Sequence, residues 1–216
     1  LPLNYQHGLS AWIYKTLNQG NTEFTEWLHR EGYVNDYKQF KLFSFSSLLV
    51  PEFSIEGDRM RIRSSESGLI VSFYPIQSLE YFVSGLFNNQ TISIGDKKSK
   101  AAFIVRTVEK LPEFEFKPDM EFKTLSPVLI SYKYSEKQRY ARYMHPGDEL
   151  YGNLLVNNLS SKYHAFYPKK KVSDTGMATD DGLLDDTENI NHSFELLSKP
   201  KSRLVTIKSG TPQESK

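Results

Sequence analysis

The sequence predicts a mixed α+β fold whose strands lie in antiparallel pairs, and three observations support this. Apolar residues near the N-terminus recur at helical spacing before any strand-like run appears. Two later segments alternate in polarity around short turn sequences that contain glycine, which is typical of β-hairpins. Helices and strands do not alternate regularly along the chain, so a sheet built from repeated parallel strand–helix–strand units is not expected.

Two helices are predicted before the first strand. Leu9, Trp12, Ile13 and Leu17 follow helical spacing, and Gly20 is a plausible end of this helix.

A second helix follows at once, capped by Asn21 or Thr22 and ended by Gly32. Its apolar stripe consists of Phe24, Trp27 and Leu28. The first strand is then expected to begin near Phe40.

Turn sequences predict two hairpins, with Gly57-Asp58 inside residues 54–63 and Ser67-Gly68 inside residues 64–74. A third helix is predicted next, ending at Asn88-Asn89, from the spacing of Ile76, Leu79, Phe82, Val83 and Leu86.

Two further strands, residues 91–95 and 101–111, complete the first half. A proline-bounded extended connector at residues 111–119 then marks a candidate boundary, so we predict domains at residues 1–115 and 116–216.

The second half has fewer clear signals. Residues 121–134 fit a strand pair or a bent strand, with Pro127 at an edge or bulge. Asp148 is expected to cap a helix whose apolar positions are Leu150, Tyr151, Leu154, Leu155 and Leu159. Residues 173–192 are polar and acidic, which favours a loop or mobile insertion, and residues 202–210 fit a final strand.

Composition and motifs exclude several classes of protein. No apolar run is long enough to cross a bilayer, and the N-terminus lacks the pattern of a signal peptide, so a cytoplasmic location is expected. The chain has no cysteine and therefore no disulfide or thiolate site. Its five histidines are scattered, and no metal-binding, dinucleotide-binding, P-loop or serine-hydrolase motif is present, so we expect no metal and no cofactor.

Charge is unevenly distributed although the net charge is only +1. Residues 122–171 hold nine lysines and arginines against three acidic residues, together with many tyrosines. Such a block suits the backbone and bases of a nucleic acid. On charge alone, an ordinary solvated face is the favoured interpretation.

Residues with suitable chemistry lie on and after the two N-terminal helices. Tyr14 and His29 each follow a core-facing residue by one position, so each lies about 100° around its helix, at the margin of the apolar stripe. The C-terminal turn of a helix favours a cation, and imidazole donates protons near neutral pH. Lys38 and Lys41 follow a short loop and could stabilise an anion. On spacing alone, a set of ordinary boundary and surface residues fits better than a groove that cleaves phosphoesters.

The order of six segments adds a resemblance to a known family. They are LNYQHGLSAWIYKTL, EFTEWLHREGY, KQFKLFSFSSL, FKTLSPVLIS, YMHPGDELYGNLLVNNLSSKYHAFY and KPKSRLVTIKSG. Their sequence and order resemble the CRISPR-associated repeat-RNA endoribonucleases of the RAMP superfamily, which process precursor crRNA. No single segment is specific, but the six together cover most of the chain.

The resemblance implies a fold, a reaction and a site. The fold would be two ferredoxin-like (RRM-like) domains in tandem. The reaction would be attack of a 2′-hydroxyl on the adjacent phosphate without a metal ion, leaving a 2′,3′-cyclic phosphate and a 5′-hydroxyl. By position in the family motifs, His29 would be the general acid, Tyr14 would activate or position the 2′-hydroxyl, and Lys41 would stabilise the charge of the transition state. The family's glycine-rich loop is not found in these 216 residues, so the second domain is expected to be incomplete.

Partners and alternatives follow from the same resemblance. CRISPR repeat RNA, or crRNA, is the expected partner, and other CRISPR-associated effector subunits and a second copy of the chain are further candidates. The candidate RNA-binding residues are Lys38, Arg59, Arg61, Arg63, Arg139 and Arg142. For the arginines, solvated strand and loop charge fits equally. The alternative functions are a non-cleaving RAMP-type subunit that holds crRNA and a scaffold that contacts only proteins.

Overall fold

The structure, a computed structural model, describes residues 1–133, 141–168 and 193–201. These residues form two compact units. The described part of unit 1 consists of Leu1–Arg30 and Leu42–Pro127. Unit 2 consists of Glu31–Lys41 and the described part of Val128–Ser202. A short segment from the N-terminal half, Glu31–Lys41, therefore groups with the second unit.

The two N-terminal helices lie where their apolar spacing predicted them. Helix α1 spans Gln6–Gly20 and helix α2 spans Thr22–Arg30. Leu9, Ile13 and Leu17 of α1 are fully buried. Burial of three such side chains contributes about 1.5–3 kcal/mol each to folding, which gives this helix a firm position.

Asn21 is the residue that caps α2, which confirms one of the two predicted caps. Its Oδ1 accepts a hydrogen bond from the backbone N–H of Phe24, with an N–O distance of 2.8 Å. Gly32 follows α2 with φ 65°, the left-handed conformation that ends many helices.

The cap gives a first test of local stability. Asn21→Ala should lower the free energy of unfolding by about 1 kcal/mol, because the first turn of α2 loses a partner for one of its N–H groups. Urea denaturation followed by circular dichroism measures this. Asn21→Asp, which keeps an acceptor oxygen, should stay close to wild type. Equal loss in both variants would contradict a capping role.

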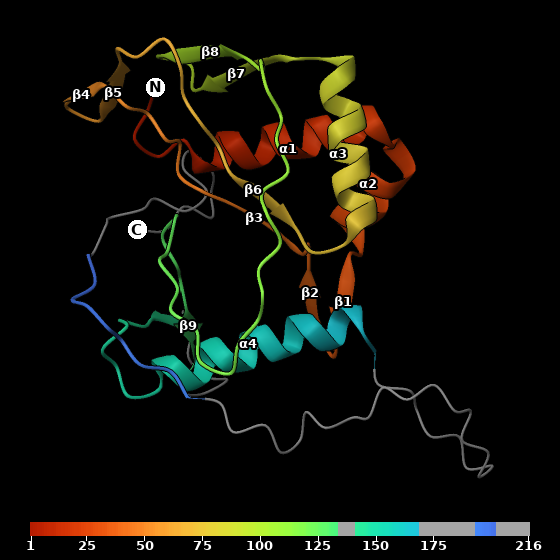
Figure 1. The fold of residues 1–216 in the computed structure, drawn as a ribbon, viewed down its shortest axis with the longest axis vertical. Helices are drawn as coiled ribbons and strands as arrows, with labels where there is room; N and C mark the ends of the chain where they lie inside the picture. The colour runs from red at the N-terminus through yellow and green to blue at the C-terminus, as the bar shows by residue number, and fades with distance from the viewer. Residues whose placement is uncertain (134–140, 169–192, 202–216) are drawn as a thin grey trace. The chain divides into compact units, whose positions relative to one another are not determined.

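Helix α3 spans Ile76–Asn88 and crosses α1 at very short range (Figure 1). The crossing depends on two glycines. A Cβ at Gly85 would overlap the backbone carbonyl of Thr16, and a Cβ at Gly20 would overlap the backbone carbonyl of Tyr81. The two helix backbones can therefore approach each other only because these positions carry no side chain.

Three strand pairs follow α2 in the described part of unit 1, and one of the two predicted hairpins is present. Strands β4 (Phe53–Glu56) and β5 (Arg59–Ile62) pair antiparallel around Gly57-Asp58, as predicted.

The predicted hairpin at Ser67-Gly68 is wrong. Strand β6 (Val71–Phe73) pairs instead with β3 (Phe43–Phe45), far away in the sequence, and Gly68 forms a bridge with Leu49. A turn sequence of this kind therefore did not decide which strand β6 would pair with.

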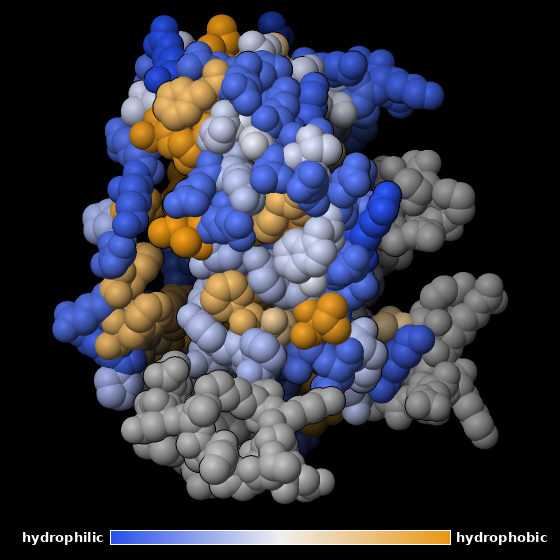
Figure 2. Space-filling model, turned by 90° about the vertical axis from the view of Figure 1, so that its right-hand side faces the viewer, coloured by the Kyte–Doolittle hydropathy of each residue, from blue (hydrophilic) through white to orange (hydrophobic). Residues whose placement is uncertain are grey.

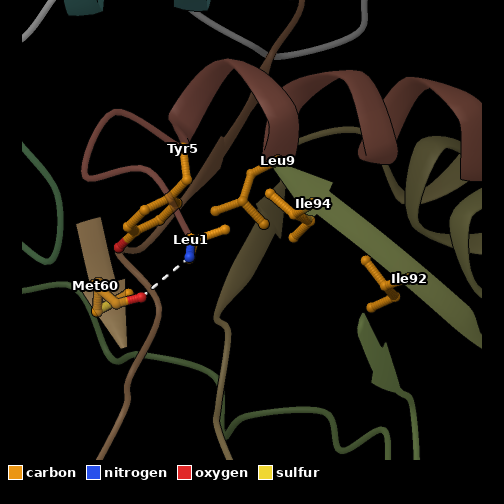
Figure 3. Close-up of a cluster of buried hydrophobic side chains, with 6 residues drawn as sticks. All are labelled: Leu1, Tyr5, Leu9, Met60, Ile92 and Ile94. Atoms are coloured by element: carbon orange, nitrogen blue, oxygen red, sulfur yellow. Dashed lines mark hydrogen bonds between the residues drawn. The ribbon is translucent and has the colours of Figure 1, made fainter. Parts of the chain in front are cut away.

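The remaining hairpin of unit 1 supplies part of its core. Strands β7 (Thr91–Gly95) and β8 (Lys100–Ile104) pair antiparallel, and Ile92 and Ile94 face inward. Figure 3 shows these residues with the other members of the buried cluster, which are Leu1, Tyr5, Leu9 and Met60. The backbones of Leu1 and Met60 exchange two hydrogen bonds, of 3.0 and 2.7 Å, which fix β5 against this core.

Unit 2 is built around helix α4, Tyr151–Phe166. Strands β1 (Tyr33–Asn35) and β2 (Lys38–Phe40) form a hairpin that packs on α4, with the rings of Tyr33 and Phe166 5.6 Å apart. The predicted strand near Phe40 is therefore the end of a hairpin, and a further strand, β3 in unit 1, begins at Phe43.

Two predictions for the second half need correction. The described residues 121–133 contain no strand pair of their own: β9 (Ser131–Tyr132) pairs with β10 (Arg142–Tyr143), which lies beyond the predicted segment. Asp148 does not cap α4, because its Oδ2 accepts a hydrogen bond from the backbone N–H of His145 and the N-terminal flanking residue is Leu150. The predicted segments 173–192 and 202–210 lie outside the described residues.

The connector between the halves, residues 105–130, contains no helix or strand. Its backbone is tied to unit 1 where the N–H of Ser47 donates to the carbonyl of Leu125. No helix in the described residues is long and apolar enough to cross a membrane. On the face shown in Figure 2, apolar residues occur in small groups between polar ones.

Candidate active site

Tyr14 and His29 meet where α1 and α2 pack together in unit 1. Their ring centroids are 5.8 Å apart and the ring planes are at 78°, an edge-to-face contact. Each residue follows a fully buried neighbour, Ile13 in α1 and Leu28 in α2. The buried neighbours set the rotation of both helices, and this rotation brings the two rings to one margin of the helix pair.

Strand β3 supports Tyr14 from a second direction. The Phe43 ring lies 5.5 Å from the Tyr14 ring, and Phe43 pairs across the strands with Phe73 of β6. Tyr14 is thus held between an imidazole and an aromatic strand residue. Burial raises the pKa of the Tyr14 phenol above its ordinary value. The phenol therefore keeps its proton at neutral pH and is able to donate a hydrogen bond.

A cavity of about 320 Å³ opens beside these two rings. It is lined by Tyr14, Thr25, Glu26, His29 and Arg30, which all belong to unit 1. Sequence reasoning identified Tyr14 and His29 but missed Glu26 and Arg30. The sequence carried a signal for both residues, because positions 29 and 30 follow position 26 by three and four residues. On a helix, this spacing places all three side chains on one face. In the described residues, no group of three or more metal-binding side chains lies together.

Lys41 and Lys38 belong to unit 2, so their place in this site stays a prediction. Partial burial lowers the pKa of the Lys41 ammonium below its ordinary value. Leu42, directly after it, has φ 51°, a left-handed conformation that is costly for a branched side chain. The Lys38 ammonium lies 5.8 Å from the centre of the Tyr37 ring.

The predicted RNA-binding arginines have different surroundings. Arg59 is held within the fold by Asp96 at 2.7 Å and by Asp58 at 3.2 Å. Hydrogen bonds from the Ser99 backbone and from Arg59 hold the pKa of Asp96 at about 2. These contacts give Arg59 a structural role in unit 1, whatever its contacts with RNA.

Arg61 and Arg63 lie on the same side of the β5 chain as Arg59 and are exposed. Arg61 makes one long ion pair, 3.6 Å, with Glu56, and Arg63 donates to Ser54 Oγ at 3.4 Å. Arg142 is exposed in β10 of unit 2, whereas Arg139 lies outside the described residues.

Comparison with known families places the chain in a class of CRISPR-associated proteins. Residues 1–109 match the N-terminal domain of the CRISPR-associated protein Cas6, and residues 109–212 match the Cas6 C-terminal domain. The chain belongs to the Cas6 family, which is the RAMP-type resemblance that the six sequence segments predicted.

Individual relatives agree with this assignment. The chain is 27% identical over 174 residues to "CRISPR-associated endoribonuclease Cas6 1" of Methanocaldococcus jannaschii, covering 79% of this chain and 63% of that relative. It thus spans less than two thirds of that protein's length.

Solved structures show the same fold. One, a CRISPR-associated protein Cas6, is 27% identical, has a TM-score of 0.58, and is matched over 80% of this chain and 67% of that chain. Another, a Cas6-related protein from Pyrococcus furiosus, is 23% identical with a TM-score of 0.63, over 76% and 63% of the two chains. A third, described as a RAMP protein binding different RNA substrates, is 20% identical with a TM-score of 0.61, over 76% and 64%.

Proposed function

We propose that this chain is an endoribonuclease that cuts CRISPR repeat RNA to produce crRNA without using a metal ion. The observation that carries the proposal is the contact between Tyr14 and His29 beside a cavity of about 320 Å³. The relative from M. jannaschii is named as an endoribonuclease, which supports the same reaction. Cleavage would begin with attack of a 2′-hydroxyl on the adjacent phosphate and would leave a 2′,3′-cyclic phosphate and a 5′-hydroxyl.

Each proposed site residue has its own role in this reaction. His29 donates a proton to the 5′-oxygen as it leaves, because imidazole is the side chain best suited to proton transfer near neutral pH. Tyr14 orients the nucleophile through its phenol, whose raised pKa keeps it protonated. Lys41 offsets the negative charge that builds up on the phosphorus oxygens.

The fold proposed for the two halves is a tandem of ferredoxin-like domains, at residues 1–115 and 116–216. The likeness to the P. furiosus structure and the antiparallel strand pairs beside α1 and α3 support it. We further propose that the protein works in the cytoplasm on repeat RNA, with other CRISPR-associated subunits and a second copy of the chain as partners.

If the exposed arginines contact RNA, replacing them should change how strongly RNA affinity depends on salt. The double variant Arg61→Gln, Arg63→Gln should reduce the slope of log affinity against log salt by about 2, because each lost phosphate contact reduces it by about 1. Fluorescence anisotropy with repeat RNA at several salt concentrations measures the slope. Arg106→Gln, which removes another exposed arginine of unit 1, should leave the slope unchanged. Equal slopes for the double variant and wild type would remove these two residues from the RNA surface.

The direct test of function is incubation of the full-length protein with repeat RNA from its own locus in EDTA. Cutting should proceed, and mass spectrometry should find a 2′,3′-cyclic phosphate on the upstream product. An RNA with a 2′-deoxy nucleotide at the cut site should stay intact, because the nucleophile is then absent. Tight binding without cutting would indicate a crRNA-holding subunit instead, and no RNA binding would indicate a scaffold for proteins.

A further inference from the structure

Glu26 places a carboxylate in the cavity lined by Tyr14 and His29. The roles proposed above assign no function to this carboxylate. We propose that Glu26 is the general base that removes the proton from the attacking 2′-hydroxyl. Arg30 offsets the charge that such a carboxylate brings beside a phosphate. This inference rests on the proposed function of the site and adds the step that function lacks.

Helix geometry places these side chains together. Glu26 precedes His29 by three residues and Arg30 by four, so the three lie on one face of α2, and all three line the same cavity as Tyr14. The spacing separates the backbone positions of Glu26 and His29 by slightly less than one helical turn, about 4.5 Å along the axis. An in-line displacement needs such a separation, because the nucleophile and the leaving oxygen lie on opposite sides of the phosphorus.

The protonation states of the side chains that line the cavity favour Glu26 over Tyr14 as the base. The titratable or charged groups that line the cavity are Tyr14 from α1 and Glu26, His29 and Arg30 from α2. Phe43, which packs on Tyr14 from β3, carries no ionisable group. His29 must hold a proton to act as the acid, Arg30 stays protonated, and burial raises the pKa of Tyr14. The carboxylate of Glu26 is the lining group left to accept a proton.

With Glu26 as the base and His29 as the acid, all protons and bonds of the cleavage step are accounted for. The 2′-hydroxyl proton passes to the Glu26 carboxylate as the 2′-oxygen bonds to phosphorus. The bond between phosphorus and the 5′-oxygen breaks, and that oxygen takes a proton from His29. Exchange with water then returns one proton to His29 and removes one from Glu26, so no metal, oxidant or second substrate is consumed.

Electrostatics explains why Arg30 is needed in the same cavity. A carboxylate next to a phosphate is repelled by it, and this repulsion weakens substrate binding. Arg30 lies one turn from Glu26 and carries a permanent positive charge with several N–H donors, which suits a phosphate oxygen. Arg30→Gln should therefore raise KM several-fold, whereas Arg30→Lys should restore most of the affinity.

Cleavage kinetics on the full chain test the base directly. Glu26→Gln should lower kcat by about 10²- to 10⁴-fold, the usual loss for a general base, and KM should stay the same or fall because the repulsion of the phosphate is removed. Glu26→Asp, which keeps the carboxylate on a shorter stem, should recover part of the rate. Glu23→Gln is the matched control, because it removes another exposed glutamate of α2 that does not line the cavity. Glu26 is itself exposed, so the thermal unfolding midpoint should not move.

A modified substrate separates the base from the acid. Replacing the 5′-bridging oxygen at the cut site by sulfur creates a leaving group that needs no proton. This RNA should restore cutting by His29→Ala but not by Glu26→Gln. The inference would be overturned if the sulfur-substituted RNA restored cutting by both variants. It would also be overturned if Glu26→Gln cut ordinary RNA at the wild-type rate. Failure of the wild-type protein to cut either RNA would instead overturn the proposed function.

Discussion

Replacing His29 by alanine should slow cleavage of repeat RNA by about 10²- to 10⁴-fold, the usual range for loss of a general acid. Without the imidazole, the 5′-oxygen must leave as an alkoxide or wait for a proton from water. His29 lies in an edge-to-face contact with Tyr14 and on the rim of the cavity, so the loss falls on the chemical step. RNA affinity should change little, because one imidazole contributes few phosphate contacts. Single-turnover cleavage and anisotropy measure the two quantities separately.

His7→Ala provides the matched control for this prediction. His7 is an exposed histidine of α1 and does not line the cavity, so its loss should leave the rate unchanged. If His29→Ala cuts at the wild-type rate, His29 is only a polar residue at the end of a helix and the catalytic assignment fails. If both variants are slow and also melt early, the effect comes from unfolding rather than from proton transfer.

The second large effect concerns the crossing of α1 and α3. Gly85→Ala should lower the free energy of unfolding by about 3 kcal/mol or more, at the upper end of the cost of overpacking. The added methyl group would meet the backbone carbonyl of Thr16, which cannot turn aside as a side chain could. The gain in helix propensity from glycine to alanine, about 1 kcal/mol, offsets only part of this cost.

Urea denaturation measures the loss, and Ser84→Ala is the control. Ser84 is an exposed residue of α3 next to Gly85, so its replacement should change stability by less than about 0.5 kcal/mol. Gly85→Ala should also slow cleavage, because α1 carries Tyr14 and must shift to accommodate the methyl group. Wild-type stability in Gly85→Ala would show that the two helices are not in close contact.

Local signals predicted the parts of this fold that depend on neighbours in the sequence. The stripe of Leu9, Ile13 and Leu17 predicted α1 because a helix forms within one segment and buries one face. Asn21 could be named as a candidate cap for the same reason, since its partner, Phe24, is only three residues away. Gly57-Asp58 predicted the β4–β5 hairpin because a tight turn leaves the following strand little choice of partner.

Pairings between distant segments could not be predicted in this way. Ser67-Gly68 has the composition of a hairpin turn, yet β6 pairs with β3 because the aromatic residues Phe43 and Phe73 pack together there. The segment Glu31–Lys41 belongs to unit 2 because Tyr33 packs on Phe166, a contact that nothing in its own sequence reveals.

The sequence by itself determined the family, the helices and the two residues at the margin of the helix pair. Ordered motifs and helical spacing are properties of short segments, and the family motifs together with the rotation of each helix pointed to Tyr14 and His29. Only the tertiary structure decided that these rings meet, that Phe43 supports one of them, and that Glu26 and Arg30 share their cavity. The physical reason is that a cavity forms between packed elements. Its lining depends on how closely α1 and α2 approach and at what rotation, which the buried contacts of the whole unit set together.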